Sequence, residues 1–302
     1  MPLRPEILVL PRDDGGVDLY DPLLEQLYCW PEVTRAHLLD PDPELVRRLA
    51  AASLLEGELA QVLREQIIAS RRRVPPLPAP VAHVPAVDWT RAEDLPDGVS
   101  PRWRDGEGLR RAAEDRAAGR ELTVLRAFLA PAFAEVLLRQ VTALPMERLD
   151  QGIVHADRHR LEAGLPSLRR LLLDPLTREL LGAVLGVALP DGLAANAWRF
   201  GPGDHLSTHP DGKRYRATFA VGLCSGWSAA DGGAIAFGPP SPDGTLRVQE
   251  RWLPHLGDVC LFVPGPTTWH CVEPPSRTRW TVSGWWTDGA RLPQSLPLDQ
   301  KA

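Results

Sequence analysis

The last third of the chain is a succession of short strand-like runs, and this rhythm constrains the fold more than any other feature of the sequence. From residue 194 onward, runs such as ANAWRF, TFAVGLC, GAIAFG, DVCLFV and RWTVSGWW alternate with turns rich in Pro, Gly and Asp. Short strands separated by such turns are typical of an all-β sandwich or barrel. The many late tryptophans favour a β-architecture with an aromatic-lined pocket.

Helical patterns dominate the segment before this β-region. The run FLAPAFAEVLLRQVTAL at 128–144 places apolar side chains at helical spacing, and SLRRLLLDPLTRELLGAVLG at 167–186 does the same. In the second run, which forms one or two helices, we expect Ser167 to be the cap and Asp174-Pro175 to be the break. Helices followed by strands predict an α+β domain over residues 89–302.

Residues 1–72 are predicted to form a small module of their own. The runs ILVL and VDLY flank a DDGG turn, which is a hairpin signal. Apolar spacing predicts a helix over 22–39, a second helix that begins at Asp42-Pro43, and a third at about 58–68. A Pro-rich stretch at 73–88 then predicts an extended, stiff linker.

Composition excludes several classes of protein. Hydrophobic residues make up 44% of the 302 residues, which is typical of a globular chain, and the net charge of -5 argues against a nucleic-acid binder that relies on bulk positive charge. No apolar run reaches the roughly 18–20 residues of a membrane span, and the first residues lack a secretory signal pattern. Four scattered cysteines predict reduced thiols, so we expect a cytoplasmic protein.

The stretch STHPDGKRYR places His209 and Asp211 two residues apart, after a glycine-containing turn. A polar surface loop would explain the pair, whereas a metal site requires a third ligand. His270 follows the buried run DVCLFV 61 residues later, and positions i and i+2 of a strand share one face. Two imidazoles and one carboxylate leave adjacent coordination positions open, which favours the facial triad of non-haem iron(II) over a four-ligand structural zinc site.

A basic residue nine positions after His270 suggests an anion site. Alternation along RTRWTVSGWW puts Arg279, Thr281 and Ser283 on one face. A buried arginine there can hold a carboxylate through two parallel hydrogen bonds, with help from the threonine hydroxyl. Arg277 has the same parity and is the competing clamp, but the preceding PPS looks like a turn.

The ordered set of these motifs resembles the prolyl-hydroxylase-like branch of the 2-oxoglutarate- and Fe(II)-dependent oxygenases. The matching stretches are NAWRFGPGDHLSTHPD, DGGAIAFG, LGDVCLFVPGPTTWHCVEP and SRTRWTVSGWW, which together span about 90 of the 302 residues. The resemblance implies a double-stranded β-helix (jelly-roll) core with flanking helices. It also implies that His209, Asp211 and His270 hold catalytic Fe(II), while Arg279 binds the far carboxylate of 2-oxoglutarate beside Thr281.

The chain departs from the family pattern at one position. The family commonly has a tyrosine near the Gly-containing turn that bonds the cosubstrate, whereas this chain has Phe200. That contact is therefore missing or is supplied by Asn196 or Trp198. Related halogenases have a small residue in place of the carboxylate ligand, so the presence of Asp211 favours a hydroxylase.

The resemblance implies oxidative decarboxylation of 2-oxoglutarate coupled to hydroxylation of an unactivated C–H bond, with ascorbate as a candidate reductant. Two alternatives stay open at this point: a β-barrel metal-binding protein without catalysis, such as a sensor, and a cupin-like metalloenzyme that needs no cosubstrate. A second HxD pair, His155 and Asp157, competes weakly for the metal, because it precedes a helical pattern and lacks a strand context.

The substrate is expected to be an amino acid or a peptidyl side chain in a biosynthetic pathway. The N-terminal module resembles, weakly, the winged-helix peptide-recognition domains attached to enzymes that modify ribosomal peptides, and a dimerising or packing module is the commoner alternative. Arg199, Arg214 and Arg216 are candidate contacts for an acidic substrate group, although surface charge explains them equally well.

Overall fold

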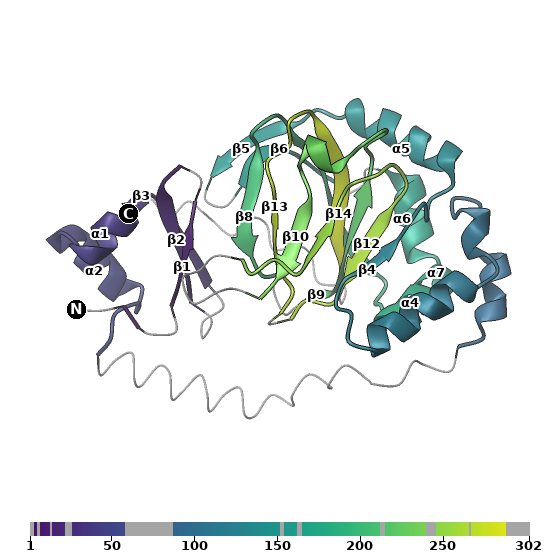
Figure 1. The fold of residues 1–302 in the computed structure, drawn as a ribbon, viewed down its shortest axis with the longest axis horizontal. Coiled ribbons are helices and arrows are strands. Elements are labelled where there is room, and N and C mark those ends of the chain that lie inside the picture. The colour runs from purple at the N-terminus through teal and green to yellow at the C-terminus, as the bar shows by residue number, and fades with distance from the viewer. Residues whose placement is uncertain are drawn as a thin grey trace.

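The computed structural model describes the regions that carry all of the predicted metal and cosubstrate residues. The described residues are 3–4, 7–12, 14–21, 26–57, 87–151, 154–161, 165–211, 215–239, 246–265 and 267–287. The predicted helix at 58–68, almost all of the predicted linker at 73–88, and Arg214 lie outside them. The domain boundaries therefore stay predictions. Figure 1 shows a small N-terminal sheet with two helices beside a larger barrel of strands.

The N-terminal unit is a three-stranded antiparallel sheet followed by two helices. Strands β1 (Leu8–Pro11) and β2 (Gly16–Asp21) form the predicted hairpin, and β2 pairs with β3 (Gln26–Thr34). Helices α1 (Arg35–Leu39) and α2 (Pro43–Ala51) complete it. The predicted helix over 22–39 is wrong for most of its described length, because pairing with β2 makes residues 26–34 a strand.

The second helix begins where the sequence predicted. The Asp42 side chain accepts a hydrogen bond from the Leu45 backbone N–H at 2.7 Å, which caps the N-terminus of α2. Leu45 and Leu49 then pack against the sheet in a hydrophobic cluster that includes Leu19 and Val33 but no barrel residue. The N-terminal unit thus has a core of its own.

The predicted helices before the β-region are largely confirmed. Trp89–Asp94 (η1), Pro101–Trp103 (η2), α4 (Glu107–Ala117), α5 (Pro131–Thr142), α6 (Pro166–Leu173) and α7 (Pro175–Leu185) follow in order. Asp174 caps α7 and ends α6, as expected from Asp174-Pro175. Ser167 is not the cap of α6, however, because Leu165 occupies that position and Pro166 is the first helical residue.

Antiparallel strands form a nearly closed barrel. They are β4 (Thr123–Leu125), β5 (Glu147–Gln151), β6 (Val154–Arg160), β7 (Gly192–Phe200), β8 (His205–His209), β9 (Tyr215–Gly222), β10 (Ile235–Gly238), β11 (Glu250–Trp252), β12 (Val259–Phe262), β13 (Trp269–Val272) and β14 (Arg279–Thr287), with the short turn η3 (Ala229–Asp231) before β10.

The strand order is that of a jelly roll. Strands β11-β10-β13-β8 form one wall and β7-β14-β9-β12-β4 form the other, while β6 pairs with both β8 and β7. This arrangement confirms the α+β class and the double-stranded β-helix. The hairpin β5–β6 was not predicted, since it interrupts a segment whose apolar spacing is mainly helical.

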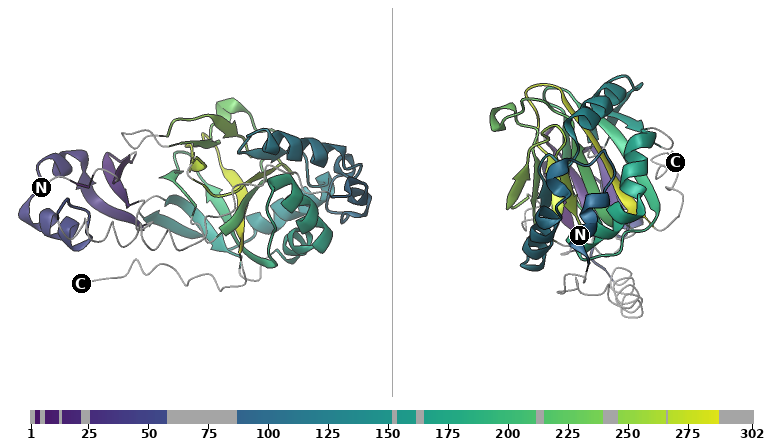
Figure 2. Two further views of the ribbon diagram at one scale, coloured as in Figure 1. Left: turned by 90° about the horizontal axis from the view of Figure 1, so that it is seen from below. Right: turned by 90° about the vertical axis from the view of Figure 1, so that its right-hand side faces the viewer.

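Alternation along the strands separates an inner face from an outer one. Phe200, Phe237 and Phe262 belong to a cluster inside the barrel. Val282 and Trp286 of β14 face the other way, into the larger cluster beneath the helices. Figure 2 shows these helices gathered on the side of the barrel away from the N-terminal sheet.

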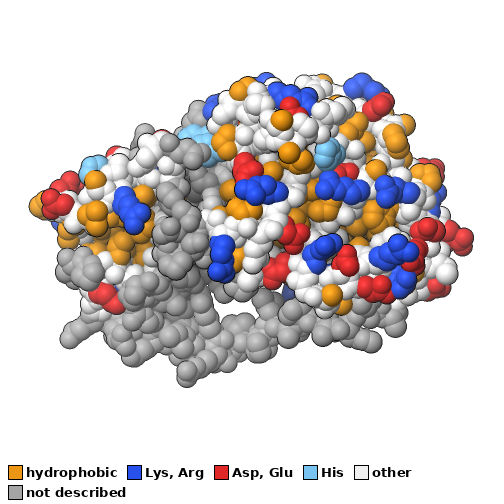
Figure 3. Space-filling model, viewed as in Figure 1, with side chains coloured by type: hydrophobic (Ala, Val, Ile, Leu, Met, Phe, Trp, Pro, Cys, Tyr) orange, Lys and Arg blue, Asp and Glu red, His pale blue; other side chains and the backbone are white. Residues whose placement is uncertain are grey.

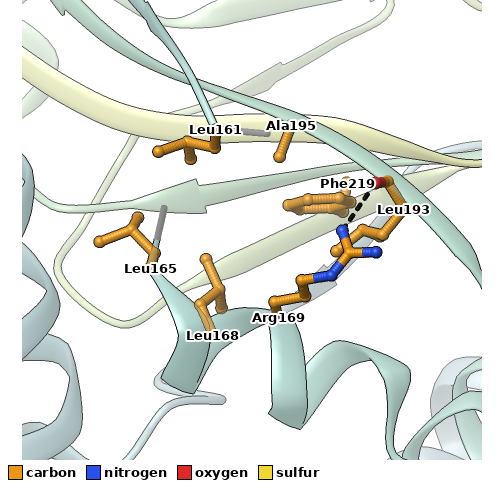
Figure 4. A pocket seen from close by; sticks show the side chains of 7 residues that line it. All are labelled: Leu161, Leu165, Leu168, Arg169, Leu193, Ala195 and Phe219. Carbon is orange, nitrogen blue, oxygen red and sulfur yellow. Dashed lines mark hydrogen bonds between the residues drawn. The ribbon is translucent and has the colours of Figure 1, made fainter. Parts of the chain in front are cut away.

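A narrow crevice lies on the outer, helix-covered side of the barrel (Figure 4). Leucine side chains line it, and Arg169 donates from Nη1 to the Leu193 carbonyl at 2.9 Å. The crevice is therefore part of the packing of α6 on β7, on the face of the sheet opposite the barrel interior.

The surface carries both signs of charge. On the face drawn in Figure 3, basic and acidic side chains are interspersed over the barrel and the helices. Many form exposed pairs, such as Arg110 with Glu107 and Arg91 with Glu179. Within the described ranges, no helix is long and apolar enough to cross a membrane. The four cysteines are present as thiols, as predicted.

Candidate metal centre

The topology brings His209, Asp211 and His270 to one point. His209 ends β8 and lies directly opposite His270 of the neighbouring strand β13, with ring centroids 4.4 Å apart. Asp211 follows two residues after His209. One potential ligand atom from each of the three side chains lies within 4.8 Å of the others. In the part of the chain that the structure describes, no other group of three His, Cys, Asp or Glu side chains is this close.

A β-bulge turns His209 toward the barrel interior. His270 pairs with His209, but Val272 pairs with Leu206, so β8 has one more residue than β13 between these two pairs. An extra residue in one strand breaks the simple alternation and re-aims a side chain. Leu206 packs against the interior cluster, and the bulge lets His209 share that side despite its opposite parity.

Fixed partners orient two of the three side chains. The Thr218 hydroxyl donates to Asp211 Oδ2 at 2.6 Å, so Asp211 Oδ1 can bind a metal ion. His270 is buried, and its Nδ1 lies 3.1 Å from the Thr268 carbonyl. Donation from Nδ1 to this carbonyl leaves the His270 Nε2 lone pair available, which is the usual way in which a metal-binding imidazole is oriented.

Thr218 is a residue that the sequence did not identify, and its replacement is the first test of the site. We expect Thr218→Val to weaken Fe(II) or Mn(II) binding by about 10–100-fold, since the Asp211 carboxylate loses its orienting donor. Isothermal titration calorimetry with Mn(II), in the presence of 2-oxoglutarate, measures the metal affinity.

Thr177→Val is the matched control for Thr218→Val. Thr177 is equally buried and donates to Asp174 at 3.1 Å, but it lies in α7. Equal metal affinity in the Thr218 variant and this control would contradict an orienting role for Thr218.

Arg279 lies deeper in the barrel, where it is 1% exposed. Its Nε donates to the Gly233 carbonyl at 2.7 Å and its Nη1 to the Thr281 hydroxyl at 3.0 Å. Nη2 is buried and has no hydrogen-bond partner among the described residues. Burial lowers the pKa of Arg279 to about 10, so the guanidinium is still charged at neutral pH. A buried cation with an unused donor fits a carboxylate ligand.

The glycine pair before β10 makes room for this arginine. A Cβ on Gly233 would lie 3.0 Å from Arg279 Cδ, and the φ of Gly233 is +66°, a conformation that favours glycine. The competing clamp, Arg277, is exposed instead. It pairs with Asp231 and lies over the Trp227 ring, 4.3 Å from the centroid. The structure therefore places Arg279, and not Arg277, inside the barrel.

Phe200, where the family commonly has tyrosine, pairs with Arg279 across the sheet. The two predicted substitutes, Trp198 and Asn196, pair with Thr281 and Ser283. The Phe200 ring lies 5.1 Å from the Arg279 guanidinium carbon. Trp198 donates from Nε1 to Ser283 Oγ at 3.0 Å, so its only polar hydrogen is already used. Asn196 is half-buried on the same face, and of the two predicted substitutes for the missing tyrosine it is the one whose donors stay available.

The second HxD pair lies elsewhere. His155 and Asp157 belong to strand β6, so the expectation that this pair lacks a strand context is wrong. His155 stacks on His205 with centroids 4.6 Å apart, and Asp157 accepts a hydrogen bond from Arg199 Nε at 2.6 Å. These contacts give the pair a structural explanation outside the metal centre.

A small cavity adjoins the metal centre. Phe237, which lines it, stacks on the His270 ring with centroids 5.4 Å apart. Glu121 and Glu250 also line the cavity. Glu250 shares the inward parity of the fully buried Trp252, and no arginine or lysine of the described residues forms an ion pair with it. The cavity thus combines an aromatic floor with negative charge.

Comparison with known proteins agrees with this geometry. Residues 195–287 match the model of the 2OG-Fe(II) oxygenase superfamily. No curated protein matches the chain. Similar solved structures include a prolyl hydroxylase from Trichoplax adhaerens in complex with a hypoxia-inducible-factor peptide fragment, at 17% identity and a TM-score of 0.50 over 64% of this chain and 96% of that one.

Two further solved structures are similar at lower scores. A prolyl-4-hydroxylase from Pseudomonas putida has 21% identity and a TM-score of 0.49 over 60% of this chain and all of that one. A viral collagen prolyl hydroxylase from Paramecium Bursaria Chlorella virus-1 has 18% identity and a TM-score of 0.41 over 56% and 96%. The segment 195–287, which carries His209, Asp211 and His270, is thus similar to the 2OG-Fe(II) oxygenase superfamily, and the solved structures share its fold.

Proposed function

We propose that the protein hydroxylates an unactivated C–H bond of an amino-acid or peptidyl substrate in a biosynthetic pathway. In this proposal His209, Asp211 and His270 hold the iron, and Arg279 with Thr281 binds the far carboxylate of 2-oxoglutarate. The observation that carries it is the buried, unused Nη2 of Arg279 in the same barrel interior as a three-ligand metal cluster. The unused donor of Arg279 favours a site that binds a carboxylate over a metal site without this cosubstrate.

When bound, the iron and its cosubstrate supply the oxidising power, and the chain supplies position and shelter. Arg279 fixes one end of the cosubstrate, and Thr218 and Thr268 keep two metal ligands in orientation. Phe237 and Phe262 pack around His270, with ring centroids 5.4 and 5.0 Å from the His270 ring. Asn196, on the inner face of β7, supplies a polar contact where the family commonly has tyrosine.

The cavity beside His270 favours a substrate with a positively charged group. Its uncompensated carboxylate, Glu250, attracts an amine or guanidinium and repels an acid. Arg199, an earlier candidate for an acidic group, already pairs with Asp157 on β6. A basic amino acid or a basic residue of a peptide therefore suits the cavity better than an acidic one.

The N-terminal unit is proposed to bind the peptide that carries the substrate residue. Its three-stranded sheet and its separate hydrophobic core support a recognition module rather than an extension of the barrel. Under this proposal a free amino acid is turned over without the unit, whereas a peptide gains affinity from it.

Succinate formation tests the function. We expect purified protein with Fe(II), 2-oxoglutarate and ascorbate to release succinate when offered members of a panel of free amino acids and N-acetyl, N-methylamide derivatives. Basic members of the panel will give more succinate than acidic ones. Product mass spectrometry will show the gain of one oxygen atom.

Glu250→Gln tests the charge preference within the same panel. This variant will lose the preference for basic members, whereas Glu273→Gln, which removes a carboxylate paired with Arg251, will keep it. Absence of succinate with every panel member, or turnover that does not depend on 2-oxoglutarate, would exclude the proposed hydroxylase.

A further inference from the structure

An unused hydrogen-bond donor lies inside the barrel. Trp252 of β11 is fully buried, and its indole Nε1 has no hydrogen-bond partner among the described residues. A buried N–H without a partner is destabilising, so such groups are rare unless something binds them. Trp103, which is also buried, shows the ordinary case, because its Nε1 donates to the Arg126 carbonyl at 3.0 Å. The Trp252 N–H therefore calls for an acceptor that the described chain does not provide.

Trp252 faces the barrel interior on the wall that carries one of the metal ligands. Its side chain belongs to the interior hydrophobic cluster, together with Ile235 and Phe237 of the neighbouring strand β10. These two β10 residues are two positions apart, so they share one face of the strand. Phe237 pairs across the sheet with His270, and Ile235 pairs with Trp252. The indole and the metal ligand are thus inner neighbours of the same strand.

Along the barrel, Trp252 lies between the metal centre and Arg279. Its partner on β10, Ile235, comes two positions before Phe237, which marks the metal end. Another two positions earlier, the Gly233 carbonyl accepts a hydrogen bond from Arg279 Nε at 2.7 Å. Two residues of a strand span about 7 Å, so the indole is about one such step from either group. A molecule that bridges the metal and the guanidinium therefore passes the indole.

We propose that the indole N–H of Trp252 donates to the far carboxylate of 2-oxoglutarate, beside the unused Nη2 of Arg279. This inference rests on the proposed function and adds a second donor to the clamp. An indole N–H is a donor only, so it suits an anion and cannot bind a cation. A carboxylate has about four lone-pair sites, so it can accept from a guanidinium and an indole at once. One bound carboxylate thus satisfies two buried donors that the described chain leaves unused.

Binding of 2-oxoglutarate to the Mn(II)-loaded protein, without oxygen or substrate, tests the proposal. We expect Trp252→Phe to raise the Kd for 2-oxoglutarate by about 10–100-fold, because the carboxylate loses a hydrogen bond to a charged group. Isothermal titration calorimetry measures this Kd, and the affinity for Mn(II) alone will stay unchanged. Trp103→Phe is the matched control, since it also removes a buried indole N–H but lies among the helices. Its Kd for 2-oxoglutarate will stay within about twofold of the unsubstituted value.

A second ligand identifies the acceptor. 2-Oxobutyrate has the same metal-binding end as 2-oxoglutarate but lacks the far carboxylate. We expect Trp252→Phe to leave the Kd for 2-oxobutyrate unchanged, so that the preference of the protein for the diacid narrows by the same factor by which 2-oxoglutarate binding weakens. An equal loss of affinity for both ligands would overturn the proposal, because the effect would then come from packing or from the metal end.

Should Trp252→Phe fail to fold, the unsubstituted protein decides. NMR of the Zn(II)-loaded protein with nitrogen-labelled tryptophan reports each indole N–H, and contacts with Ile235 and Phe237 identify that of Trp252. We expect this proton signal to move downfield when 2-oxoglutarate binds and to stay in place with 2-oxobutyrate, because only the diacid offers the acceptor. A Trp252 signal that responds to neither ligand, or to both alike, would contradict the proposal.

The outcomes separate the role of Trp252 from the proposed function. If the unsubstituted protein does not bind 2-oxoglutarate, both fail. If it binds 2-oxoglutarate and releases succinate while Trp252→Phe binds equally well, only the role of Trp252 fails. If it binds 2-oxoglutarate but turns over no panel compound, the proposed hydroxylation fails, and the binding comparison still decides whether Trp252 holds the far carboxylate.

Discussion

Replacement of His209 by alanine is expected to abolish succinate formation, with a loss of more than about 100-fold in turnover. Removing even an outer partner of a metal ligand costs 10–100-fold in metal affinity or activity, so removal of a ligand costs more. The variant will also lose the Mn(II) binding that calorimetry detects in the unsubstituted protein, and this readout does not depend on the substrate.

His155→Ala is the control for this prediction, because it disrupts the other HxD pair of the sequence. His155 lies on β6 and stacks on His205, away from the metal cluster. We expect it to retain metal binding. If His155→Ala lost the metal while His209→Ala kept it, the assignment of the metal centre would be wrong.

Replacement of Arg279 by methionine is expected to raise the KM for 2-oxoglutarate by about 100-fold while Mn(II) still binds. Truncating one partner of a buried charge pair costs about 2–5 kcal/mol, because the carboxylate then has no cation to bind. Thermal unfolding will show a second effect. 2-Oxoglutarate with Mn(II) will stabilise the unsubstituted protein, and Arg279→Met will lose most of that stabilisation.

The free Arg279→Met protein will be as stable as the unsubstituted one or more stable. Burial lowers the pKa of this guanidinium to about 10, which means that the fold disfavours its charged form. The charge is present in the folded and the unfolded chain at pH 7, so the full cost of burial applies there. An apolar side chain of similar length avoids this cost.

Arg277→Met serves as the control for Arg279→Met, since Arg277 is exposed and pairs with Asp231 at the surface. We expect its KM for 2-oxoglutarate to stay within about twofold of the unsubstituted value, as for exposed ion pairs in general. If the Arg277 variant lost cosubstrate affinity and the Arg279 variant kept it, the clamp would be misassigned.

Much of the barrel could be predicted because strands and turns leave local signals. The runs that became β7, β9, β12 and β14 were visible as alternating or apolar segments between Gly, Pro and Asp. The helices α5 and α7 were visible because their apolar side chains recur at helical spacing, and Asp174-Pro175 marked the start of α7. Where local signals agree with tertiary pairing, periodicity alone locates the element.

The failures have a common physical cause, which is that a neighbouring strand decides the state of an ambiguous segment. Residues 26–34 carry apolar side chains that suit a helix or a strand, and β2 selects the strand. The hairpin β5–β6 exists because β6 pairs with β7 and β8, which lie far along the chain. Pairing partners at such sequence distances are invisible to spacing within a window.

The metal cluster was predictable in its residue types but not in its supports. The order of His209, Asp211 and His270 is a property of sequence, whereas the bulge that turns His209 inward is a mismatch between two strands. Thr218 gave no signal, because a threonine in a strand is an ordinary β-former. Only the fold shows that its hydroxyl lies 2.6 Å from Asp211 Oδ2.

Strand β14 has a consequence for how this protein can change during evolution. One strand carries Arg279 and Thr281 on the side that faces the barrel interior and Val282 and Trp286 on the side buried under the helices. A substitution in the helical layer that shifts Trp286 therefore also moves the backbone that carries Arg279. Helices α5, α6 and α7 should thus evolve under the same restraint as the proposed cosubstrate clamp.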